Sequence, residues 1–145
     1  ELASLVGIHD YLMDLYNHHF NNDETSLRNK IIKINNLISK HEQELANPLL
    51  RYLSTRDDFR LIGKNIITNQ NRAPTISFTN KNISSKDLSR YLVKNKIATR
   101  NDNFYAWRCL KALKINTEDG VVRISIVHYN NKDEINRIID TFNKI

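Results

Sequence analysis

The stretch that decides the fold is KIATRNDNFYAWRCLKALKINTEDGVVRISIVHYNNK, residues 96–132. Its pattern predicts a short strand over 97–100, a helix over about 104–113, and a second strand over 121–128 that ends at a polar stop. Arg100 ends the first strand and Arg123 lies on the second. Arginine presents a planar fork of donors that matches a carboxylate. Two arginines on neighbouring strand ends, beside an aromatic loop, therefore indicate a carboxylate clamp.

The role of each arginine has an alternative on the residues alone. Arg123 interrupts an otherwise apolar strand, where an unpaired charge would be costly, so it should have a partner. A structural ion pair and a ligand anion are equally compatible with this position. For Arg100, the residues by themselves favour a solvated loop side chain or a salt bridge to Asp102.

The rest of the chain predicts an α+β fold. Apolar spacing indicates helices over 1–19 and 24–53, and Pro48 is expected to kink or split the second one. Strands are expected over 59–63 and 75–79, a helix after a cap at Ser84, and a last helix after Asn131. The prediction is two helices followed by a two-layer small domain with a mixed or antiparallel sheet of three to four strands and helices on one face.

Composition narrows the class of protein. The 145 residues suit one domain, or one domain plus a piece of another. The net charge of +6 permits nucleic-acid binding, but Lys and Arg are scattered along the chain, so a basic nucleic-acid-binding module is only the alternative. No signal peptide or transmembrane segment is visible, which predicts a cytoplasmic protein without a membrane partner. Because the chain starts at Glu1 without a methionine, we expect a piece of a longer protein.

Other chemical sites are not expected. The segment His41-Glu42-Gln43-Glu44-Leu45 lacks the second histidine of the HExxH zinc motif, so no metal site is predicted. The three glycines are isolated, which excludes a glycine-rich phosphate loop. Cys109 is the single cysteine, so there is no intrachain disulfide, and we expect it to be buried and inert.

Five segments, in order, resemble one known family. The segment 73–78, APTISF, is similar to an APTVSF strand; 97–106 is similar to a GI-x-x-R-x-G-x-x-x-A segment; and 120–134 is similar to GVVRxSxxHYNTxEE. The opening ELASLVGIHDYL and the segment around His41 resemble two helices of the same proteins. Together they resemble the pyridoxal-phosphate (PLP)-dependent class V aminotransferases, fold-type-I enzymes, in the cysteine desulfurase-like branch.

The resemblance implies an organisation and a function. Residues 1–22 would be a helix of the large PLP domain, and 23–145 the C-terminal small domain with its long linker helix. The complete enzyme would use PLP on a lysine upstream of this chain, so the isolated chain should be inactive. Its partners would be an amino-acid substrate, the large PLP domain and a second subunit of a homodimer, with neither nucleic acid nor membrane.

The resemblance also implies substrate-binding residues. Arg123 would bind the substrate α-carboxylate, Arg100 would be a second substrate-side arginine, and Asn103 and Tyr105 would lie in the same substrate-binding segment. Tyr105 stands where one type of desulfurase carries its catalytic cysteine, so persulfide chemistry on this chain is not expected. Aminotransferase, desulfurase, epimerase and lyase activities stay open, as does a degenerate, non-catalytic family member.

Overall fold

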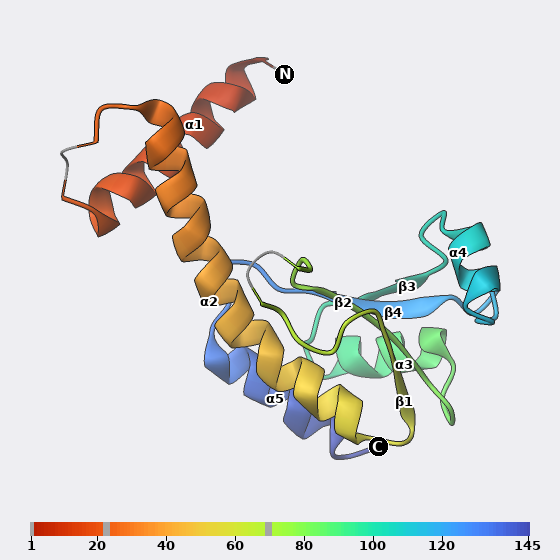
Figure 1. Cartoon of the computed structure of the whole chain (residues 1–145). Helices are drawn as coiled ribbons and strands as arrows, with labels where there is room; N and C mark the ends of the chain where they lie inside the picture. Colours follow the sequence, from red (N-terminus) through yellow and green to blue (C-terminus); the bar gives the residue numbers. More distant parts are fainter. Residues whose placement is uncertain (1, 22–23, 69–70) are drawn as a thin grey trace. The chain divides into compact units, whose positions relative to one another are not determined.

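The computed structural model describes residues 2–21, 24–68 and 71–145. They divide into two compact units, Glu1–His41 and Glu42–Ile145. The elements, in chain order, are α1 Leu2–His19, α2 Leu27–Thr55, β1 Phe59–Ile62, β2 Thr75–Asn80, α3 Ser85–Lys94, β3 Arg100–Asp102, α4 Trp107–Ala112, β4 Val121–Ser125 and α5 Lys132–Phe142 (Figure 1). The assignment of residues 1–22 to a large PLP domain stays a prediction.

The first unit holds α1 and the first part of α2. Tyr16 is fully buried and its ring stacks on Phe20, with 5.0 Å between centroids. The Lys30 ammonium lies 5.2 Å from the centre of the Tyr16 ring, and Ile34 on α2 is also buried. These residues join the two helices of this unit by apolar packing around one tyrosine.

Helix α2 continues through Pro48, so the predicted split is wrong. Proline removes one backbone donor from a helix interior and crowds the preceding turn. The residues around it, Leu45, Ala46, Leu49 and Leu50, are all buried in the core of the second unit. Proline in a helix interior costs about 3 kcal/mol or more. The three buried leucines of this face outweigh it together, because each contributes about 2 kcal/mol.

The second unit is built on a four-stranded antiparallel sheet with the order β1-β2-β4-β3. One face of the sheet carries the main core, to which α2, α3 and α5 each contribute buried side chains (Figure 1). Ile76 and Phe78 of β2 are fully buried there. Phe142 of α5 lies 5.7 Å from Phe78 and 5.0 Å from Phe59, ring centre to ring centre. The predicted α+β, two-layer plan is confirmed.

The opposite face of the sheet has a smaller apolar cluster at one end. Leu110 of α4, Ile115 and Val121 of β4 are buried together there. The Arg60 guanidinium on β1 donates to the Leu113 carbonyl oxygen at 2.6 Å and ties this segment to the sheet. The other end of this face carries the polar residues described below.

Several predicted boundaries differ from the structure by a few residues, and local hydrogen bonds account for three of them. The strand expected over 97–100 begins at Arg100, because the Ile97 amide donates to the Leu92 carbonyl and finishes α3. The strand expected over 121–128 ends at Ser125, since Val127 and Asn130 bond each other in a turn. The helix expected from 104 begins at Trp107, because 103–106 forms a tight turn.

Both predicted helix caps are confirmed. The Ser84 side chain accepts from the Asp87 amide at the start of α3. Asn131 and Glu134 form a capping box at the start of α5. Each cap satisfies backbone donors that a helix start leaves without partners. No helix in the described ranges is long and apolar enough to cross a membrane.

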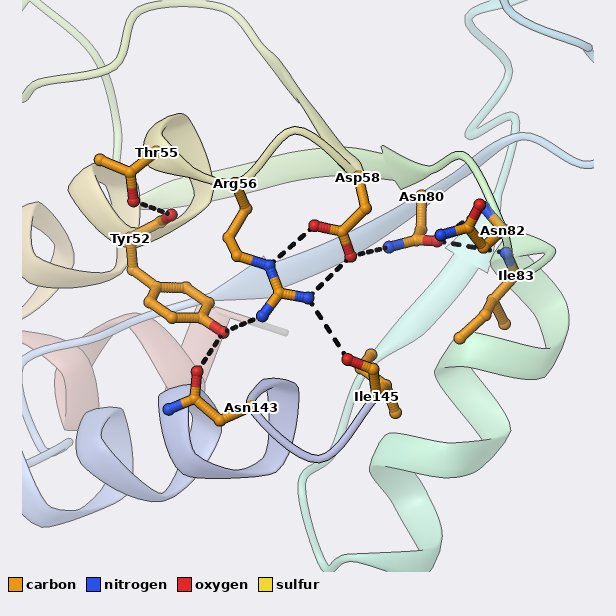
Figure 2. A network of polar contacts seen from close by, with 9 residues as sticks. All are labelled: Tyr52, Thr55, Arg56, Asp58, Asn80, Asn82, Ile83, Asn143 and Ile145. Carbon is orange, nitrogen blue, oxygen red and sulfur yellow. Dashed lines mark hydrogen bonds and ion pairs between the residues drawn. The ribbon is translucent and has the colours of Figure 1, made fainter.

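A polar network ties the ends of α2, β2 and α5 together (Figure 2). The Arg56 guanidinium donates two hydrogen bonds, of 2.7 and 2.8 Å, to the Asp58 carboxylate. It also donates to the Tyr52 hydroxyl at 3.0 Å. The Asn80 amide donates to the same carboxylate at 3.0 Å, while the Tyr52 hydroxyl donates to Asn143 at 2.7 Å. The hydrogen bonds from Arg56 and then Asn80 lower the pKa of Asp58 from 3.8 to about 2.

This pKa predicts an acid-sensitive contribution to stability. A carboxyl group whose folded pKa is depressed stabilises the fold fully above its unfolded pKa and loses that contribution as pH falls through the folded value. We therefore expect Asp58→Asn to cost about 1–2 kcal/mol at pH 7, with the difference from wild type shrinking between pH 5 and pH 2. Urea unfolding of the chain at several pH values measures this.

Asp87→Asn is the matched control for Asp58→Asn. Asp87 pairs with Arg90 at 3.4 Å, but both side chains are 64% exposed. An exposed pair of this kind contributes little to stability. A stability difference for Asp58→Asn that stays constant from pH 7 to pH 2 would contradict the depressed pKa.

Candidate functional site

Arg100 and Arg123 are direct neighbours across two strands. In the antiparallel pair of β3 and β4, the two residues are Cα partners. Directly opposite residues of an antiparallel pair point to the same face of the sheet. On its other side Arg123 is paired with Ser77 of β2, so that face also carries a small hydroxyl side chain. The structure thus brings together the two arginines that the sequence placed on separate strands.

A pocket of about 230 Å³ opens between the two arginines. Its lining consists of Ala98, Thr99, Arg100, Arg123 and Ser125. Arg100 is exposed and Arg123 is half-buried. The pocket combines two fixed positive charges with the hydroxyl groups of Thr99 and Ser125, a set of donors that suits a small anion.

Neither arginine has a carboxylate partner in the part of the chain that the structure describes. The Asp102 carboxylate, the expected partner of Arg100, instead accepts from the Asn103 amide at 2.7 Å. Like charges directly opposite each other on a sheet are destabilising. An anion between the two guanidinium groups would remove this repulsion, so the geometry supports a ligand anion over a structural ion pair.

The Arg123 guanidinium lies over an aromatic ring. Its central carbon is 4.0 Å from the centre of the Phe104 ring. Phe104 itself is half-buried and packs against the cluster of Leu110, Ile115 and Val121. The ring therefore connects the charged end of this face to its apolar end.

Phe104 and Tyr105 form the centre of a left-handed turn. Their φ angles are 50° and 60°, and the Ala106 amide donates to the Asn103 carbonyl at 2.9 Å. The Asn103 side-chain oxygen accepts from the Tyr105 amide at 3.0 Å. Left-handed backbone is uncommon for residues other than Gly, Asn and Asp, and it carries strain in bulky residues. The aromatic loop is thus a tight turn held by Asn103.

The other two predicted site residues do not line the pocket. Asn103 uses its side-chain oxygen inside the turn, and Tyr105 is 98% exposed at the tip of that turn. Their role as substrate-binding residues stays a prediction. Thr99 and Ser125 do line the pocket and were not predicted. The period of two along β4 places Ser125 on the same face as Arg123, so the sequence held a signal for it.

Cys109 is exposed, and the prediction that it is buried is wrong. Helix α4 has only six residues, and Leu110 is the one that it buries. The residue before a buried helical position lies about 100° away around the helix, which turns Cys109 toward solvent.

The described residues of this pocket do not form a cradle for PLP. The lining holds no lysine for a Schiff base, and no glycine lets backbone amides approach a phosphate. Gly63 and Gly120 are isolated in the sequence, and neither lines the pocket. Two guanidinium groups are matched in charge and geometry to a carboxylate group instead.

Comparisons with known proteins agree with this fold. The sequence model of the family described as "Aminotransferase class-V" matches residues 30–138. An aminotransferase-like protein of Gibberella zeae, FGM3, is 32% identical over 103 residues, which cover 70% of this chain and 26% of that protein. A "Probable cysteine desulfurase" of Borreliella burgdorferi is 32% identical over 108 residues, which cover 74% of this chain and 25% of that protein.

A solved structure shares the same architecture. The apo structure of a cysteine desulfurase from Thermococcus onnurineus matches with a TM-score of 0.64 at 22% identity, over 81% of this chain and 29% of that one. The chain spans about a quarter of the length of the curated relatives described above. The match to the family covers most of the chain, and the antiparallel sheet with its helices agrees with the structural neighbour. The chain belongs to the class-V aminotransferase family, and a probable cysteine desulfurase is among the relatives that its sequence resembles.

Proposed function

We propose that this chain is the part of a PLP-dependent class-V enzyme that binds the carboxylate of an amino-acid substrate. The observation that carries the proposal is the direct pairing of Arg100 and Arg123 across an open pocket, without a carboxylate partner among the described residues. Arg123 is the primary ligand in this proposal, because it is half-buried and rests on Phe104. Arg100 is exposed at the rim and adds a second charge.

The two arginines orient the substrate and leave the bond chemistry to other parts of the protein. Class-V aminotransferases and cysteine desulfurases are PLP-dependent in general, and such a cofactor supplies an electron sink for reactions at the substrate's α-carbon. A carboxylate held by a planar arginine fork has a fixed position and plane. In the proposed enzyme, the hydroxyls of Thr99 and Ser125 complete the lining around that carboxylate.

The organisation of the complete protein follows from the same proposal. The large PLP domain would supply the lysine and the phosphate site, and residues 1–22 would belong to it. A homodimer and a cytoplasmic location are further parts of this proposal, supported by what is general in the family. The pocket favours a small carboxylate over nucleic acid, because its two arginines line a single small cavity of about 230 Å³.

The proposal predicts that the complete protein is active and that the isolated chain is not. With added PLP, the isolated chain of 145 residues should turn over none of the common L-amino acids. The complete protein should turn over at least one, measured by release of sulfide, ammonia or a keto acid. Activity of the isolated chain would contradict the prediction that the lysine that binds PLP lies upstream of this chain. Inactivity of the complete, PLP-loaded protein on the whole panel would favour a degenerate family member.

A further inference from the structure

We infer that Phe104 is a positioning residue that holds the Arg123 guanidinium in its carboxylate-binding orientation. The inference rests on the proposed function of Arg123 and adds a residue that acts through it. Four observations support it. The Phe104 ring stacks on the guanidinium, its backbone is left-handed, and its ring packs against a buried cluster. Among the described residues, no other group holds the guanidinium.

The stacking geometry is close. The guanidinium carbon lies 4.0 Å from the ring centre, well inside the roughly 6 Å range over which such contacts are favourable. A guanidinium stacked on a ring has one face covered, while its in-plane N–H groups stay free to donate. The contact therefore orients the fork of Arg123 without occupying the donors that a carboxylate needs.

The backbone of Phe104 is held in a conformation that a phenylalanine disfavours. Its φ is 50° and that of Tyr105 is 60°. Turns with two left-handed residues strongly prefer Asn and Gly at these positions. Strain of this kind persists where the surrounding structure holds it, and it is often found at functional sites. If the Phe104 ring positions Arg123, there is a reason for phenylalanine to stand where Asn or Gly is typical.

The ring itself is fixed from its other side. Phe104 packs against the buried cluster of Leu110, Ile115 and Val121. Val121 lies two residues before Arg123 on β4, so both point to the same face of the sheet. The ring therefore packs against the strand that carries the arginine, and this contact limits the positions that the ring can take.

Phe104 is the one holding contact that the structure assigns to the Arg123 guanidinium within the described residues. No ion pair or hydrogen bond joins this side chain to those residues. A long arginine side chain loses substantial rotamer freedom when it binds a ligand. Because stacking on Phe104 restricts the Arg123 side chain before the ligand binds, it lowers this entropic cost and raises the affinity for the carboxylate.

The test measures binding of propionate, a carboxylate without an amine, to the complete protein by ligand-observed NMR. Phe104→Leu keeps an apolar side chain at this position but removes the π face. We expect it to weaken propionate binding about three- to fivefold, while Phe104→Tyr stays within about twofold of wild type. Propionamide, which keeps the carbon skeleton of propionate but carries no charge, serves as the control ligand, and its binding should be the same in all three proteins.

A double variant separates positioning from a purely structural effect. In an Arg123→Ala background, Phe104→Leu should cause no further loss of propionate affinity, because the residue it orients is gone. If the loss from Phe104→Leu is the same in both backgrounds, or if Phe104→Tyr binds as weakly as Phe104→Leu, the inference is overturned. Melting temperatures of all variants show whether the fold is retained.

The outcomes distinguish this inference from the function on which it rests. If Arg123→Ala binds propionate as tightly as wild type does, the carboxylate role of Arg123 fails, and the inference fails with it. If Arg123→Ala loses binding while Phe104→Leu does not, the proposed function stands and the inference alone is overturned. A wild-type protein that binds no propionate overturns both.

Discussion

Replacement of Gly120 by alanine is expected to destabilise the second unit by on the order of 3 kcal/mol or more. Gly120 has a φ of +68°, a left-handed conformation that costs an L-residue about 1 kcal/mol. A methyl group built at Gly120 would lie 2.3 Å from the carbon and oxygen of the Asp102 carbonyl. Both of these atoms belong to the backbone of β3, so no side-chain rotation can relieve the overlap.

The overlap would be transmitted to the candidate site. Asp102 is paired with Val121 on the neighbouring strand, directly after Gly120. Moving β3 away from Gly120 would therefore break the register that places Arg100 opposite Arg123. The same turn also supports α3, since the Asp119 carboxylate accepts from the Ser85 amide at 2.9 and 3.0 Å.

Urea unfolding of the chain measures the effect, with Gly7→Ala as the matched control. Gly7 lies inside α1, and a methyl group there would meet no atom within 4 Å. Because alanine is a better helix former than glycine, Gly7→Ala should be neutral or stabilising by up to about 1 kcal/mol. A Gly120→Ala protein with wild-type stability would show that β3 and the 119–120 turn do not approach each other this closely.

Arg123→Ala in the complete protein is the second change with a large expected effect. Truncating one partner of a charge-assisted pair costs about 2–5 kcal/mol, which corresponds to a loss in kcat/KM of roughly 30- to several-thousandfold. Arg123→Lys should recover only part of this loss, because an ammonium keeps the charge but lacks the planar fork. The measurement is steady-state kinetics with the L-amino acid that the complete protein turns over.

Arg60→Ala is the control for this experiment. Arg60 lies on β1, and its guanidinium donates to the Leu113 carbonyl rather than lining the pocket. Its removal should leave kcat/KM within about twofold of wild type, as expected for a side chain outside the site. Equal losses for Arg60→Ala and Arg123→Ala would point to a general effect of positive charge, and unchanged kinetics for Arg123→Ala would remove it from the substrate site.

The sequence was informative wherever the structure depends on local signals. The caps at Ser84 and Asn131 were predictable because a side chain and a backbone amide three residues apart satisfy each other without help from the rest of the fold. The α+β class was predictable because hydrophobic periods of 3.6 and 2 reflect which faces are buried. The split predicted at Pro48 was wrong, since the local cost of proline is outweighed by burial that only the assembled core supplies.

The candidate site depends both on local sequence signals and on contacts between distant segments. The chemistry of Arg100 and Arg123, and their places near strand ends, could be inferred from the residue types and the alternation of β4. Their facing positions could not, because the register of β3 against β4 is set where Ile97 completes α3 and where Gly120 meets Asp102. The stacking of Phe104 on Arg123 had no sequence signal at all, since it depends on a left-handed turn that phenylalanine and tyrosine rarely adopt.

The sequence by itself determined the class of fold, the helix caps and the residue types able to bind a carboxylate, because these follow from short-range periodicity and side-chain chemistry. The tertiary structure alone decided the strand register, the shared pocket, and the placing of Asn103 and Tyr105 outside it. These features arise from contacts between segments far apart in the chain, where packing of one element against another selects among conformations that local preferences leave nearly equal in energy.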